Sequence, residues 1–218
     1  MYWIAFGDVH ENTGVLPLIP ELPGAAGVIV TGDLTNHGTT ESARHVLDAI
    51  AAVNPAVLAQ IGNMDTGAVG RVLHERGINL HAAVRELAPG LGLMGVGYST
   101  PTPFDTPSEV SDQQMGQWLH ETHALAKDFD RLILAVHTPP VNTVTDRISN
   151  GMHVGSASVR TFIERVQPDL VLTGHIHEAV GTDLIGRTPV INPGMLAGGG
   201  YVVVTFENGE LTAELKSV

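Results

Sequence analysis

The chain begins with Met1 and then Tyr2-Trp3-Ile4-Ala5-Phe6-Gly7-Asp8-Val9-His10, which combines an apolar run with a closely spaced aspartate and histidine. Its first residues form a short apolar run, which is typical of a buried β-strand. Asp8 and His10 follow at once, and side chains two residues apart in an extended chain point to the same side. The stretch therefore predicts a buried strand whose C-terminal end presents a carboxylate and an imidazole together.

Similar apolar runs recur along the 218 residues and predict further buried strands, because each is short and rich in Val, Ile or Leu. Together with the first strand they are Tyr2–Phe6, Gly27–Val30, Ala56–Ile61, Leu93–Val96, Leu132–Val136, Leu170–Leu172, Pro189–Ile191 and Tyr201–Phe206. The last run is followed by Asn208-Gly209 and then by Leu211–Leu215, and Asn-Gly between two such runs indicates a β-hairpin.

Apolar residues at helical spacing predict three helices between the strands. The three stripes are Ala43, Val46, Leu47 and Ile50; Met115, Trp118, Leu119 and Thr122; and Val159, Phe162, Ile163 and Val166. Strands and helices alternate early in the chain and strands dominate late, so we expect an α/β sandwich. The length of the chain and its lack of a linker or repeat favour one domain over residues 1–218.

Residues that can bind metal ions follow five of the predicted strands. They are Asp8 and His10, Asp33, Asn63, His137, and His175 and His177. Ligands bind at the carboxyl edge of open α/β sheets, so we expect these groups to meet there. Carboxylates and imidazoles suit divalent transition metals. One carboxylate such as Asp33 can bridge two ions, and two ions can hold a phosphate and activate a bridging water for attack.

The same series resembles the calcineurin-like metallophosphoesterases, from residue 6 to about residue 194. The resemblance implies a four-layer αββα sandwich, in which two mixed β-sheets are flanked by helices. It also implies that one ion is held by Asp8, His10, Asp33 and His177, and a second by Asp33, Asn63, His137 and His175. The segment from His137 to Gly194 resembles a small group of archaeal and bacterial predicted phosphoesterases. Manganese is the expected ion, with iron, zinc, nickel or cobalt as alternatives.

The sequence departs from that family in Gly62-Asn63-Met64-Asp65. The family usually has histidine at the third position, linked to protonation of the leaving group, whereas methionine cannot transfer a proton. The substrate therefore needs an acidic leaving group, or another residue supplies the proton. His153 and His37 are the candidates, and an ordinary surface histidine is the alternative interpretation of each. Asp65 keeps its family position, either as a catalytic residue beside Asn63 or as a group that only orients backbone.

Composition limits the partners of the chain. The net charge of −12 argues against a basic face that grips long nucleic acid, although bound cations would still attract a small phosphoester. The chain has no cysteine, which excludes disulfides and thiolate metal sites. Its first residues do not form a secretory signal, and no apolar run reaches the roughly 20 residues of a membrane helix. A cytoplasmic protein is the expectation.

The sequence thus predicts a dinuclear metal-dependent hydrolase, with a metal-bridging hydroxide as nucleophile. It would act as a phosphodiesterase or phosphomonoesterase on a small or nucleotide-like substrate. The alternative is a protein-interaction scaffold with the phosphoesterase fold, and only Met64 favours it. In such a scaffold the metal ligands would be free to change, whereas all seven ligand positions are intact in this sequence. Residues 138–155 lack periodicity, which is typical of a functional or disordered loop.

Overall fold

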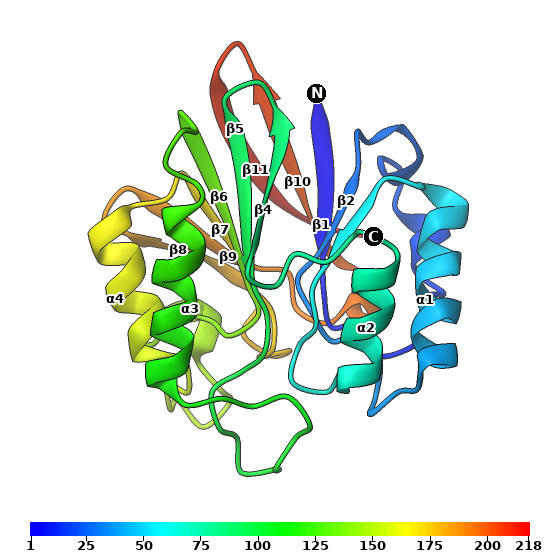
Figure 1. Ribbon diagram of the computed structural model, residues 1–218, viewed down its shortest axis with the longest axis horizontal. Helices are drawn as coiled ribbons and strands as arrows, with labels where there is room; N and C mark the ends of the chain where they lie inside the picture. The colour runs from blue at the N-terminus through cyan, green and yellow to red at the C-terminus, as the bar shows by residue number, and fades with distance from the viewer.

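Two mixed β-sheets lie face to face between two pairs of helices in the computed structural model, which describes residues 1–218 (Figure 1). Helices α1 (Thr40–Val53) and α2 (Gly67–Glu75) cover one side, and α3 (Asp112–Ala124) and α4 (Ala157–Val166) cover the other. The predicted four-layer αββα sandwich is therefore confirmed.

The first sheet has the strand order β11-β10-β1-β2-β3. Its strands are β1 (Tyr2–Phe6), β2 (Val28–Val30), β3 (Val57–Ala59), β10 (Gly200–Glu207) and β11 (Glu210–Ser217). β1, β2 and β3 run parallel, whereas β10 pairs antiparallel with both β1 and β11. The parallel strands end at one edge, which collects the segments that follow them.

The second sheet has the order β4-β5-β6-β7-β9-β8. Its strands are β4 (Ala83–Ala88), β5 (Leu91–Val96), β6 (Arg131–Val136), β7 (Leu170–Leu172), β8 (Gly181–Ile185) and β9 (Thr188–Asn192). β5, β6, β7 and β9 are parallel, and the two outer strands, β4 and β8, are antiparallel to their neighbours. Short 3-10 helices at Leu16–Leu18, Leu22–Gly24, Val144–Asp146 and Leu196–Gly198 complete the chain.

Three buried clusters separate the four layers. Along β1, Ile4 and Phe6 pack toward α1 and α2, whereas Trp3 and Ala5 pack into the cluster between the two sheets. This alternation follows from the two-residue period of a strand. The third cluster lies between the second sheet and the helices α3 and α4, where Phe162 is buried. The strands thus need apolar residues on both faces, which explains their nearly continuous apolar sequences.

The predicted strands and the three predicted helices are all present, with strand ends shifted by at most two residues. The sequence did not predict α2, whose nine residues include Gly67 and Gly70, or the outer strands β4 and β8. Outer strands bury fewer side chains: β8 alternates between exposed and more covered residues until Ile185. None of the helices is long and apolar enough to cross a membrane.

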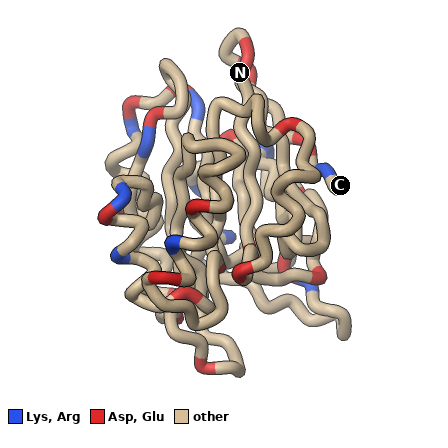
Figure 2. The backbone as a smooth tube through the Cα atoms, turned by 90° about the vertical axis from the view of Figure 1, so that its right-hand side faces the viewer, with Lys and Arg blue, Asp and Glu red and all other residues tan.

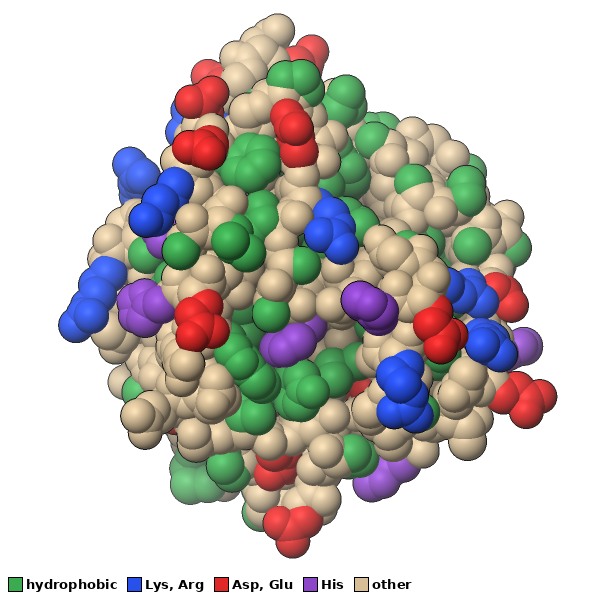
Figure 3. Space-filling view, in the orientation of Figure 1, with side chains coloured by type: hydrophobic (Ala, Val, Ile, Leu, Met, Phe, Trp, Pro, Cys, Tyr) green, Lys and Arg blue, Asp and Glu red, His purple; other side chains and the backbone are tan.

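Charged residues are dispersed over the surface. Figure 2 shows lysine and arginine as short isolated segments along the backbone rather than as a stripe. The space-filling view of the face seen in Figure 1 likewise shows basic side chains scattered among acidic and apolar ones (Figure 3). This distribution agrees with the acidic composition and gives no broad basic surface on the faces shown.

Candidate metal centre

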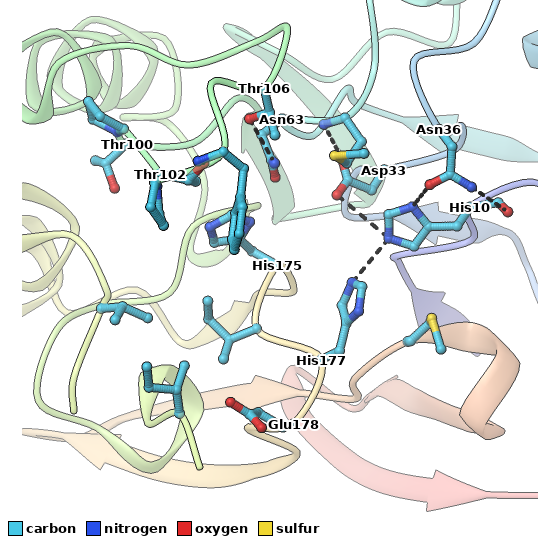
Figure 4. A pocket seen from close by; sticks show the side chains of 18 of the residues that line it. His10, Asp33, Asn36, Asn63, Thr100, Thr102, Thr106, His175, His177 and Glu178 are labelled. Atoms are coloured by element: carbon cyan, nitrogen blue, oxygen red, sulfur yellow. Dashed lines mark hydrogen bonds and ion pairs between the residues drawn. The ribbon is translucent and has the colours of Figure 1, made fainter. Parts of the chain in front are cut away.

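Five strands bring the seven predicted ligands to one region at their carboxyl ends. Asp8 follows β1, Asp33 follows β2, and Asn63 follows β3 in the first sheet. His137 follows β6 directly, and the segment with His175 and His177 follows β7. Residues from both sheets therefore face each other across the edge of the sandwich, as Figure 4 shows for Asp33, Asn63, His10, His175 and His177.

One group of donors consists of Asp8, His10 and His177, whose ligand atoms lie within 4.8 Å of one another. The two imidazole Nε2 atoms face each other at 3.0 Å. Asp8 Oδ1 lies 3.3 Å from His177 Nε2 and 4.0 Å from His10 Nε2. Asp33 Oδ2 completes this side at 3.8 Å from His10 Nε2. The four residues that the resemblance implies for the first ion thus lie close together.

A second group of donors surrounds His137. Its Nε2 lies 3.4 Å from Asp33 Oδ2 and 3.0 Å from Asn63 Oδ1. The His175 ring lies beside it, with ring centroids 5.2 Å apart. Asp8, Asp33 and His137 also have ligand atoms within 4.8 Å of one another. Asp33 is therefore close to both groups, as a bridging carboxylate must be.

Backbone conformation aims several of these side chains. Asp8, His10, Asp33 and His175 have φ values of 50°, 47°, 52° and 70°, in the left-handed region that residues other than glycine rarely occupy. Each such residue costs on the order of 1–3 kcal/mol, and such strain concentrates at functional sites. Hydrogen bonds hold the strained loops together, because Val9 N and His10 N both donate to the Asp33 carbonyl, at 2.8 and 3.0 Å. These bonds tie the loop that carries Asp8 and His10 to the loop that carries Asp33.

Buried charge makes this region suited to cations. Asp8 and Asp33 are 0% and 2% exposed, and their only ion-pair partners are histidines. Buried carboxylates without a Lys or Arg partner are costly unless a metal ion compensates them. Burial alone would lower the pKa of His137, but the carboxylates of Asp33 and Asp8 raise it to about 9. The donor set therefore fits divalent metal ions, as the carboxylates already attract positive charge.

Neighbouring carbonyl groups orient two of the imidazoles. His137 Nδ1 lies 3.2 Å from the Thr31 carbonyl oxygen, and His10 Nδ1 lies 2.8 Å from Asn36 Oδ1. Each Nδ1 therefore donates its proton to that carbonyl, which turns Nε2 toward the other donors. At His137 a metal ion would displace the second proton, which the nearby carboxylates favour on Nε2. Burial and the nearby His137 lower the pKa of His175 to about 4, so that ring is neutral at pH 7 as a ligand must be.

A chain of hydrogen bonds orients the amide of Asn63. Its Nδ2 donates to Thr106 Oγ1 at 3.0 Å, so its Oδ1 faces His137. The Thr106 hydroxyl in turn donates to Glu109 Oε1 at 2.5 Å, which leaves its lone pairs for Asn63. Burial alone would raise the pKa of Glu109, but hydrogen bonds from Thr102 and Thr106 lower it to about 2. Thr106 and Glu109 are not among the site residues predicted from the sequence.

Asp65 acts as a structural tie between two loops of the site. It is fully buried, and its oxygens accept from Leu34 N, Thr35 N, Thr35 Oγ1 and Gly62 N at 2.8–3.0 Å. Burial and the charge of Asp33 raise its pKa to about 7. It does not line the cavity described below. Three of these four contacts are to backbone N–H groups, which are the contacts that the backbone-orienting role, the second of the two expected for Asp65, requires.

The two candidate proton donors differ in position. His153 does not line the cavity, because its Nδ1 pairs with the buried Asp146 carboxylate at 2.7 Å. Asp146 also accepts from the backbone N–H groups of residues 142, 143 and 155, so residues 138–155 form an organised loop. His37 does line the cavity, and its backbone N–H donates to the Met64 carbonyl at 2.9 Å. Of the two histidines, only His37 lies beside Met64, the residue that stands where the family usually has a histidine.

The donors open into a cavity of about 1150 Å³. His10, Asp33, Asn63, His175 and His177 form part of its lining. The rest comes from the segment of residues 99–110, from the loop of residues 138–155, from residues beside His177, and from Asn36, His37, Met64 and Met195. The candidate ligands are therefore accessible to a molecule that enters from solvent.

Comparisons with known proteins agree with this geometry. The family model described as metallophosphoesterase, calcineurin superfamily, matches residues 118–215. An archaeal relative, uncharacterized protein MJ1162 of Methanocaldococcus jannaschii, is 32% identical over 197 residues, which cover 87% of this chain and 86% of that protein. The alignment with this relative therefore extends over most of the chain, beyond the part that the family model matches.

Solved structures share the fold over nearly the whole chain. TT1561 of Thermus thermophilus superposes with a TM-score of 0.73 at 18% sequence identity, covering 98% of this chain and 97% of that one. A dimetal phosphatase from Danio rerio superposes with a TM-score of 0.67 at 10% identity, covering 100% and 96%. At these identities the likeness establishes the architecture alone.

Proposed function

Because this chain belongs to the calcineurin superfamily of metallophosphoesterases, we propose that it hydrolyses phosphate esters of small or nucleotide-like molecules with two divalent metal ions. The observation that carries this proposal is the pair of buried carboxylates, Asp8 and Asp33, which face histidines and have no Lys or Arg partner. Residues 1–218 would act as one catalytic domain.

In this proposal Asp8, His10, Asp33 and His177 hold one ion, and Asp33, Asn63, His137 and His175 hold the other. Manganese is the expected metal, and iron, zinc, nickel or cobalt would suit the same donors. Bound metals of this kind neutralise phosphoryl oxygens and lower the pKa of water. The chain itself contributes fixed positions, since the strained loops and the Thr106 contact hold the ligands before substrate arrives.

We assign protonation of the leaving group to His37, because Met64 cannot transfer a proton. His37 lines the cavity and its backbone is bonded to that of Met64. A general acid matters most when the leaving group is a poor one. His37→Gln should therefore slow hydrolysis of an ethyl or phenyl ester far more than that of a p-nitrophenyl ester. Equal slowing of all three esters would remove His37 from this role.

The experiment that tests the function is a metal-reconstitution assay. Metal-stripped protein is supplied with Mn²⁺ and assayed on bis-p-nitrophenyl phosphate and p-nitrophenyl phosphate, beside an Asp33→Ala variant. We expect activity to return with Mn²⁺ in the unmodified protein only, because Asp33 is close to both donor groups. If no divalent metal restores activity and the protein binds less than one ion, the catalytic proposal fails and the scaffold alternative replaces it.

A further inference from the structure

Part of the cavity lining is apolar. Six hydrophobic residues line the cavity: Met64, Phe104, Ile148, Val154, Ile176 and Met195. They come from separate segments of the chain, so no single amphipathic element accounts for them. Pockets of roughly 300–1,000 Å³ enclose whole drug-sized ligands. A cavity of about 1150 Å³ therefore has room for far more than one phosphate group.

Phe104 has the largest of these six apolar side chains and is 80% exposed. An exposed aromatic side chain on a loose loop would carry little meaning, but this segment is tied down. Glu109 Oε1 accepts from Thr102 Oγ1 at 2.6 Å and from Thr106 N at 2.9 Å. Phe104 follows Pro103 in the chain, and its N–H donates to Thr102 Oγ1 at 3.1 Å. The ring is thus presented to the cavity from a fixed backbone, as a stacking surface should be.

The same segment lies beside the metal ligands. Thr106 accepts from Asn63, so the loop that carries Phe104 is bonded directly to a proposed ligand. Figure 4 shows Thr100 and Thr102 on one side of His175, and Asp33, His10 and Asn36 on the other. A phosphate held at the ligands can therefore extend one of its substituents toward the segment of residues 99–110.

The charge of the lining limits which phosphoester fits. None of the 19 lining residues is Lys or Arg, and Glu178 adds a carboxylate to the lining. A phosphomonoester carries about −1.5 to −2 charge at pH 7, and such groups are usually bound by Arg or Lys. A phosphodiester carries a single negative charge. Outside the metal ligands, this cavity offers no Lys or Arg for the second charge of a monoester.

We propose that the preferred substrate is a monoanionic phosphodiester in which one ester group is flat and apolar and stacks on Phe104. This inference rests on the function proposed above and narrows it to a substrate class. The apolar residues of the lining contact the ester group, and the metal ligands receive the phosphate. Phe104 determines which ester group binds and takes no part in breaking the ester bond.

The test is a binding comparison on Mn²⁺-loaded protein by isothermal titration, with diphenyl phosphate, diethyl phosphate and phenyl phosphate as probes. Both diesters carry one charge and differ only in the ester groups. Diphenyl phosphate should bind about tenfold more tightly than diethyl phosphate, the lower end of what one aromatic stacking contact provides. It should also bind more tightly than the monoester phenyl phosphate.

Matched variants separate stacking from general damage. Phe104→Ser should reduce the diphenyl-to-diethyl ratio to within about twofold, whereas Phe104→Tyr should keep it, because a ring remains to stack. Leu184→Ser is the control, since Leu184 is 65% exposed on β8 and does not line the cavity. Its ratio should equal that of the unmodified protein.

Two results would overturn the inference: equal binding of the two diesters by the unmodified protein, or an unchanged ratio in Phe104→Ser. If phenyl phosphate binds more tightly than diphenyl phosphate, the claim that the preferred substrate carries a single negative charge is wrong. Hydrolysis of bis-p-nitrophenyl phosphate by the same Mn²⁺-loaded sample distinguishes a failure of this inference from a failure of the proposed function. Hydrolysis without aromatic preference removes only this inference, whereas no hydrolysis of any phosphoester removes the proposed function itself.

Discussion

Gly62 has no room for a side chain, and Gly62→Ala should damage stability and metal binding together. A Cβ at this position would lie 2.6 Å from the Asp33 backbone nitrogen and 2.6 Å from His137 Cε1, and it would also overlap Asp33 Oδ1. Real Cβ atoms essentially never come within 3.0 Å of such neighbours. Gly62 is not among the residues with positive φ, so the effect of alanine is steric alone.

The magnitude follows from what must move. Overpacking a buried site typically costs about 1–3 kcal/mol. Here one of the overlapping groups is backbone, which cannot rotate away, so we expect a loss of about 3 kcal/mol, at the upper end of that range. For a chain of this size, 1 kcal/mol corresponds to roughly 2–4 °C in Tm, which gives a decrease of about 6–12 °C. Displacement of Asp33 and His137 should also weaken Mn²⁺ binding at least about tenfold.

Gly70→Ala is a control with the same chemical change and the opposite expected sign. Gly70 lies inside α2, where the nearest atom to an added Cβ is Ile61 Cγ2 at 3.8 Å, an ordinary contact. Alanine in a helix interior is about 0.5–1 kcal/mol more favourable than glycine. Its Tm should therefore rise slightly, with unchanged Mn²⁺ affinity.

The assay is thermal unfolding of metal-free protein, followed by circular dichroism, with Mn²⁺ titrations of all three proteins. The reasoning is refuted if Gly62→Ala unfolds within about 1 °C of the unmodified protein, a small fraction of the decrease expected from overpacking. Undiminished Mn²⁺ affinity in that variant would refute the claim that Asp33 and His137 belong to the metal site.

Three further predictions follow from other contacts. Thr106→Val removes the acceptor of Asn63 Nδ2 and should lower kcat/KM on bis-p-nitrophenyl phosphate by roughly 10–100-fold, whereas Thr106→Ser should retain most activity; an active valine variant would contradict this role. Burial lowers the pKa of His81 from 6.5 to about 4, so the folded state loses stability relative to the unfolded state as the pH falls from 6.5 to 4. The loss of unfolding free energy reaches about 3 kcal/mol. In His81→Asn, whose amide oxygen can still accept from Gly97 N–H, the unfolding free energy measured with urea should depend less on pH. Mn²⁺ at about 100 times its Kd should stabilise the unmodified protein by about 2.7 kcal/mol and Asp33→Ala by much less, and equal stabilisation in a thermal shift assay would count against a bridging Asp33.

The ligand positions could be predicted because a few adjacent residues show both an apolar run and a metal-binding side chain directly after it. Asp8-Val9-His10 and Gly174-His175-Ile176-His177 place metal-binding side chains directly after apolar runs. A strand end and a metal-binding residue type are both visible locally, and parallel strands bring their ends to one edge. The structure shows these residues gathered at that edge.

The supporting residues could not be predicted in the same way, because their partners are distant in sequence. Thr106 is 43 residues from Asn63, and the Asp65 carboxylate binds N–H groups about 30 residues away. A buried glutamine, Gln60, donates to carbonyl groups of Thr31, Val96 and Ala135 and so links the two sheets beneath the site, without any local pattern. Such contacts exist only once the sandwich has formed.

Helix α2 and strands β4 and β8 were missed for a related reason. α2 carries two glycines and buries only Val69, Val72 and Leu73, so its apolar pattern is short. The outer strands are covered on fewer sides and carry polar residues at intervals that resemble a loop. Tertiary pairing, rather than local sequence preference, fixes these three elements.

Anomalous diffraction at the manganese edge, from crystals soaked in Mn²⁺, would show whether two metal ions bind beside Asp33. We predict two peaks, about 3.5–4 Å apart, one on each side of the Asp33 carboxylate. One should contact His10 and His177, and the other should contact Asn63 and His137. A single peak, or peaks away from these donors, would contradict a dinuclear site.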